Sequence, residues 1–78
     1  MDFKKETIGE RLRAVRIERG INAVEIAKAV GISKSAMSQI ESGNVIPSMQ
    51  TLFAVCQLLD ISADYLLGLS DNPDSHKD

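Results

Sequence analysis

The chain is poor in the residues that mark several large protein classes. Its 78 residues include one cysteine, Cys56, so an intramolecular disulfide is excluded. The longest uninterrupted apolar run is Leu52 to Cys56, far below the roughly 20 residues that a membrane-spanning helix needs. Residues 1–6 mix both charges and lead into no apolar export signal. We expect a cytoplasmic protein with no membrane segment, in which Cys56 is a core residue.

Catalytic and metal-binding residues are scarce as well. His76 is the only histidine and has no second histidine or nearby cysteine with which to share a metal ion. Ser70-Asp71-Asn72 matches one short motif of penicillin-binding proteins, but the chain has no Ser-x-x-Lys. The five glycines are scattered, so there is no glycine-rich phosphate loop. We expect no enzyme, no metal ion, no cofactor and no small-molecule ligand.

The net charge of −2 is small but unevenly distributed. Residues 1–43 carry eight Lys and Arg against six acids, a net +2, whereas residues 44–78 carry one lysine against five aspartates, a net −4. The first half is therefore the half that suits a polyanionic partner.

Glycines and capping residues divide the chain into short helices. Gly20, Gly31 and Gly43 suit helix ends. The side chains predicted to cap helix starts are Thr7 with Glu10, Asn22 with Glu25, Ser33, Ser48 and Ser62. Apolar residues between these positions keep helical spacing. The predicted helices span about residues 8–19, 23–30, 34–42, 49–59 and 63–67. We expect one compact all-α domain over residues 1–68 and a loose acidic tail over 69–78.

Residues 22–43, Asn-Ala-Val-Glu-Ile-Ala-Lys-Ala-Val-Gly-Ile-Ser-Lys-Ser-Ala-Met-Ser-Gln-Ile-Glu-Ser-Gly, resemble the Cro/C1-type (Xre) helix-turn-helix repressors of phages and bacteria. The resemblance continues through Pro47-Ser48 and Thr51-Leu52 to residues 60–67. It implies a five-helix, lambda-repressor-like domain that acts as a transcriptional regulator. It also implies that the third helix enters the DNA major groove, commonly as a homodimer on a palindromic operator.

The third predicted helix carries side chains that suit base edges. Opposite its apolar positions Met37 and Ile40 stand the candidate base-reading residues Lys34, Ser35, Ser38 and Gln39. Gln pairs bidentately with adenine, Lys reaches guanine acceptors, and Ser serves either donors or acceptors. A lysine in the first helical turn also faces the unfavourable end of the helix dipole, and a nearby anion reverses that penalty. A plain solvated face is the alternative.

Helix starts offer backbone amides to phosphates, so we expect phosphate contacts at Asn22, Ala23 and Ser33. Arg13 and Asn44 are the candidate side-chain helpers. The resemblance further implies a structural ion pair between Arg16 and Glu41.

Apolar residues near the last helix exceed what one short helix buries, which predicts a homodimer. The candidate interface residues are Leu58, Ile61, Tyr65, Leu66 and Leu69.

Two positions depart from the family pattern. Ala23 stands where a glutamine is usual, and the loop Asn44-Val45-Ile46 lacks the usual Lys or Arg. We therefore expect weak non-specific DNA binding. The alternative function is a protein-interaction module on the same fold, such as an antitoxin or an anti-repressor partner.

Overall fold

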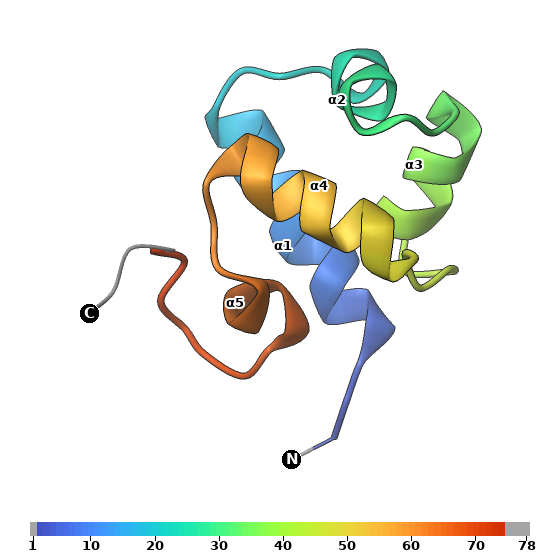
Figure 1. Cartoon of the computed structure of the whole chain (residues 1–78). Coiled ribbons are helices and arrows are strands. Elements are labelled where there is room, and N and C mark those ends of the chain that lie inside the picture. Colours follow the sequence, from blue (N-terminus) through green and yellow to red (C-terminus); the bar gives the residue numbers. More distant parts are fainter. Residues whose placement is uncertain (1, 75–78) are drawn as a thin grey trace.

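The computed structural model describes residues 2–74, which form five α-helices around one core (Figure 1). The helices are α1 (Lys5–Glu18), α2 (Ala23–Val30), α3 (Lys34–Glu41), α4 (Met49–Leu59) and α5 (Ala63–Leu67). α1 and α4 cross the middle of the molecule, with α2 and α3 at one end and α5 near the other. Within residues 2–74 the only β-type pairing is one antiparallel bridge between Ile61 and Asp74. The expected five-helix, all-α fold is confirmed.

Four of the five helices are capped at their start by the residue that the sequence predicts as the cap. The Asn22 side chain accepts from the Glu25 amide at 2.8 Å, and the Glu25 carboxylate accepts from the Asn22 amide at 3.1 Å. Ser33, Ser48 and Ser62 each accept from the amide three residues later. These local bonds satisfy amides that have no partner within the helix.

The first helix differs from the prediction at its start. α1 begins at Lys5, and its N-cap Lys4 makes no side-chain capping bond. Thr7 therefore lies inside the helix, where its predicted capping box with Glu10 does not form. A tertiary contact accompanies the extra turn, because the Lys5 ammonium donates to the Asn44 carbonyl at 3.3 Å. α3 also ends at Glu41, one residue before the predicted end.

The core is formed by residues from all five helices and from the α4–α5 connection. Its fully buried members include Ile8, Leu12, Ile26, Met37, Val55, Leu59 and Leu66. Cys56 is half-buried and packs against this cluster, and burial raises the pKa of its thiol. In the part of the chain that the structure describes, no helix combines the length and the apolar character that crossing a bilayer requires.

Gly9 allows α1 to approach α3 closely. A Cβ atom at this position would lie 2.4 Å from the Ile40 carbonyl oxygen and 2.6 Å from that of Glu41. Real Cβ atoms do not come this near to backbone, so only glycine fits without a shift of one helix. The α1 backbone therefore rests directly on the last turn of α3.

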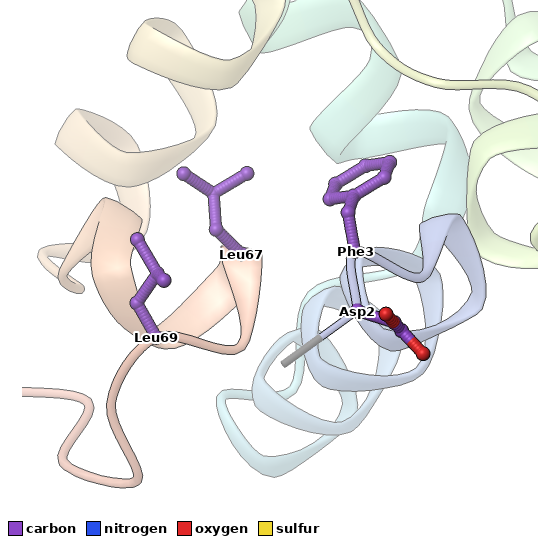
Figure 2. A pocket seen from close by; sticks show the side chains of 4 residues that line it. All are labelled: Asp2, Phe3, Leu67 and Leu69. Carbon is purple, nitrogen blue, oxygen red and sulfur yellow. The ribbon is translucent and has the colours of Figure 1, made fainter.

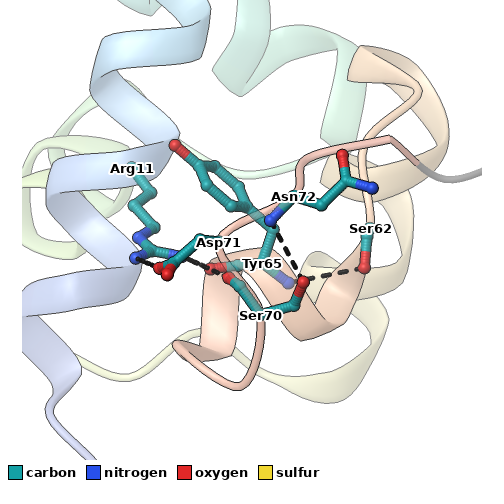
Figure 3. Close-up of polar contacts among 6 residues, drawn as sticks. All are labelled: Arg11, Ser62, Tyr65, Ser70, Asp71 and Asn72. Carbon is teal, nitrogen blue, oxygen red and sulfur yellow. Dashed lines mark hydrogen bonds and ion pairs between the residues drawn. The ribbon is translucent and has the colours of Figure 1, made fainter.

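Residues 69–74, the first part of the predicted tail, make several hydrogen bonds to the rest of the domain. This segment, which we call the strap, runs beside α5 and is bonded to α1 and to the α4–α5 connection (Figure 3). The Arg11 guanidinium donates to the carbonyls of Tyr65 and Ser70, both at 2.7 Å, and the Ser62 amide donates to Pro73 at 2.9 Å. The partners are 54 and 59 residues from Arg11 in sequence, and local composition cannot reveal such bonds. Residues 75–78, with His76, lie outside the described residues.

Candidate nucleic-acid interface

A buried ion pair joins α3 to α1. Arg16 Nε lies 2.7 Å from Glu41 Oε2 and its Nη2 lies 2.9 Å from Oε1, while Nη1 donates to the Ile21 carbonyl at 2.8 Å. The two side chains are only 11% and 8% exposed. Because the guanidinium donates to the carboxylate, the pKa of Arg16 is raised. The pair implied by the resemblance is present, and its partners belong to the scaffold rather than to the surface.

The connection between α2 and α3 is a tight turn built on Gly31. Its φ of 81° lies in the left-handed region that favours glycine, and the Ile32 amide donates to the Ala27 carbonyl at 2.9 Å. Ala27, Met37 and Ile40 are buried between the helices. The apolar side of α3 therefore faces inward and fixes which side faces out.

The outward side of α3 carries the four side chains predicted to read bases. Lys34, Ser35, Ser38 and Gln39 are all exposed. They project from one side of a helix whose opposite side is buried, which is the arrangement that a groove-reading helix needs.

Gln39 is oriented by the loop that follows α3. Its side-chain oxygen accepts from the Asn44 amide group at 3.1 Å, and its carbonyl accepts from the backbone amides of Asn44 and Val45. The amide group of Gln39 is left to donate outward, and its oxygen retains a second lone pair. Asn44, predicted to bind phosphate, thus lies where it positions Gln39. Sequence reasoning missed this role because the bond depends on the path of the loop.

The two helix starts differ as phosphate sites. At Ser33 the hydroxyl caps the helix by accepting from the Ala36 amide, and the first-turn amides of α3 begin at Lys34. At Asn22 both the amide and the side chain are engaged by Glu25, which places a carboxylate at the start of α2. Of the predicted pair at α2, the Ala23 amide is the better candidate.

Two cations border the α3 surface. Arg13 is exposed, and it stands four residues after Gly9 and three before Arg16, on the side of α1 that meets α3. Lys5 reaches the carbonyl of Asn44 at 3.3 Å and so supplies a positive charge to a loop that has none of its own. The sequence did not single out Lys5, since the predicted helix started after it.

Comparison with known proteins identifies the family to which this fold belongs. A family model described as Helix-turn-helix matches residues 12–66. The chain belongs to this helix-turn-helix family. It is similar to YazB of Bacillus subtilis (strain 168), an HTH-type transcriptional regulator, with 43% identity over 64 residues that cover 82% of this chain and 93% of YazB. It is also similar to the HTH-type regulator YobD of the same organism, with 35% identity over 65 residues, 83% of this chain and 58% of YobD.

A solved helix-turn-helix structure agrees in fold. The c2 repressor of Salmonella phage P22, crystallised in complex with a synthetic operator, superposes with a TM-score of 0.73 and 40% identity over 77% of this chain and 91% of the repressor chain. Proteins of this family are DNA-binding transcription regulators rather than enzymes. The chain spans about half the length of the first curated relatives that it matches, 58% and 43%.

The structure corrects two of the predicted interface residues of this helix-turn-helix domain. Ile61 and Leu66 are 2% and 0% exposed, so they pack into the core of one protomer and have no surface for a second. The apolar spacing of a five-residue helix is too short to show which side chains point inward. Tyr65 is half-buried beneath Arg11, whose guanidinium carbon lies 4.3 Å from the ring centroid. Leu58 and Leu69 are exposed.

Proposed function

We propose that this chain is the sequence-specific DNA-binding domain of a transcriptional repressor, which inserts α3 into the major groove of a palindromic operator as a homodimer. The observation that carries the proposal is the outward side of α3, where Gln39 is exposed and held by Asn44 on a helix fixed by the Arg16–Glu41 pair. The operator complex of the similar P22 c2 repressor supports a DNA partner. The expected cytoplasmic location stays a prediction.

The α3 surface gives the readout test. Double-stranded DNA is first selected from a random pool with the wild-type chain. Replacing Gln39 by alanine is then expected to cost about 1–3 kcal/mol of binding to the selected site and to relax base preference at one position in each half-site. The thermal midpoint should stay unchanged, because Gln39 is exposed. Fluorescence anisotropy and circular dichroism measure the two quantities.

Gln57→Ala is the matched control, since Gln57 is an exposed glutamine on α4 rather than on α3. It should change neither quantity. Intact discrimination in the Gln39 variant would mean that α3 does not lie in the groove.

Phosphate contacts give a salt test. Replacing Arg13 by alanine is expected to weaken binding to selected and random DNA alike and to reduce the slope of log K against log salt by about 0.9, the value of one phosphate contact. The measurement is binding at several salt concentrations. A loss confined to the selected sequence would assign Arg13 to base readout instead.

The protein-interaction module remains the second candidate, because Val45 and Ile46 are 45% and 55% exposed beside Gln39. Neither Arg13 nor Lys34 is needed for that function. A chain whose biological activity survives alanine at both positions would favour it.

A further inference from the structure

An exposed apolar pair lies beside the candidate base-reading surface. Val45 and Ile46, in the connection between α3 and α4, are 45% and 55% exposed. Other exposed apolar side chains lie elsewhere, as do Phe3 and Leu69, which border a hollow at the α5 end (Figure 2). The Val45 backbone amide, in contrast, donates to the Gln39 carbonyl at 3.3 Å. A molecule that contacts the Gln39 side chain therefore passes close to Val45.

The backbone that leads to Val45 is held from two sides. Gly43 has a φ of 84°, in the left-handed region, and a Cβ atom there would lie 3.1 Å from the Glu6 Cα atom, so this turn packs against the first turn of α1. The side chain of the next residue, Asn44, donates to a side chain of α3 at 3.1 Å, and its carbonyl accepts from Lys5 at 3.3 Å. The loop is therefore ordered before any binding, which lowers the entropic cost of a contact made by its side chains.

The composition of this loop suits a base edge better than a phosphate. Asn44-Val45-Ile46 contains no charged side chain, so it supplies no cation for a phosphate contact. In the DNA major groove the base pairs present hydrogen-bond donors and acceptors and one apolar group, the C5-methyl group of thymine. Because the side chain of Val45 forms no hydrogen bonds, this methyl group is the feature of the base edges that it can recognise.

We propose that Val45 reads the C5-methyl group of a thymine next to the base that Gln39 reads. The base-reading surface then extends from α3 into the following loop, where it selects thymine by apolar contact instead of by hydrogen bonds. The inference rests on the proposed function, because it needs α3 in the major groove, and it adds a specificity-determining residue and the base that this residue selects. It also assigns the exposed apolar loop to DNA recognition rather than to the protein contact of the second candidate function.

Uracil in place of thymine tests the proposal on the DNA, because uracil lacks only the methyl group. Each thymine of the site selected with the wild-type chain is replaced in turn, and binding is measured by fluorescence anisotropy. Replacing the thymine that Val45 contacts should weaken wild-type binding about fourfold, the loss expected for one buried methyl group. The same replacement should leave the binding of Val45→Ala nearly unchanged, because that variant no longer makes the contact. Val45→Ala should also melt at the wild-type temperature, since Val45 is exposed.

Val24→Ala is the matched control, since Val24 is a valine on α2 that is 54% exposed. Any loss that it causes should add to the loss from uracil at every thymine. Val45→Ala and uracil should instead be non-additive by about fourfold, and only at the thymine next to the position where Gln39→Ala relaxes base preference.

Each outcome decides the inference. A selected site without thymine next to the base read by Gln39 would overturn it, and so would uracil substitutions that weaken the wild type and Val45→Ala equally or that weaken neither. These results would leave the proposed function intact, because the Gln39 test does not involve the methyl group. A selection that yields no preferred site, or a Gln39→Ala chain that keeps its base preference, would overturn the proposed function and this inference together.

Discussion

Replacing Glu41 by alanine is expected to lower the free energy of unfolding by about 3–5 kcal/mol, because the substitution leaves the Arg16 guanidinium buried without its partner. For a domain of this size the thermal midpoint should fall by at least about 12 °C. Circular-dichroism melting and urea unfolding measure the effect. Base preference in the fraction that stays folded should be that of wild type, because the Glu41 side chain is buried against Arg16 rather than exposed on the outward side of α3.

The paired variant Arg16→Met/Glu41→Leu separates the charge from the packing. Removing both partners leaves no unpaired buried charge, so the double variant should be more stable than Glu41→Ala. A loss of less than about 1 kcal/mol in Glu41→Ala is the size seen for exposed ion pairs and would contradict the scaffold role.

Replacing Gly9 by valine is expected to cost about 3 kcal/mol or more, since the new side chain meets the carbonyls of Ile40 and Glu41, which are backbone and cannot move aside. Denaturant unfolding gives the cost. Operator affinity of the folded fraction should also fall, because relief of the clash displaces α3 relative to α1.

Ala14→Val is the control for Gly9→Val. Ala14 is exposed on the same helix, so only the lower helix propensity of valine, about 0.6 kcal/mol, should be lost. Equal losses in the two variants would show that the close approach at Gly9 adds nothing.

Local signals predicted most of the helical framework. Asn22, Ser48 and Ser62 each cap the helix expected after them, and Gly31 ends α2 where predicted. Such features act over three or four residues and are visible in the sequence. The start of α1 was misplaced because its extra turn accompanies a contact between Lys5 and the distant Asn44.

The sequence predicted which residues form the candidate site, but not the hydrogen bonds that these residues make with one another. The exposed side of α3 followed from the spacing of Met37 and Ile40. The bond from Asn44 to Gln39 and the engagement of the α2 start by Glu25 depend on side-chain geometry. The strap, held by Arg11, depends on contacts more than fifty residues apart.

The contact at Gly9 also bears on how such a domain diversifies. Two contacts hold α3 in place: the close approach of the α1 and α3 backbones at Gly9, and the buried Arg16–Glu41 ion pair. Neither contact involves the exposed residues Lys34, Ser35, Ser38 and Gln39. Substitutions at those four positions can therefore change which sequence is read without moving the helix that reads it. A duplicated gene could acquire a new operator by a few changes on this surface, while Gly9 and the ion pair keep the helix in place.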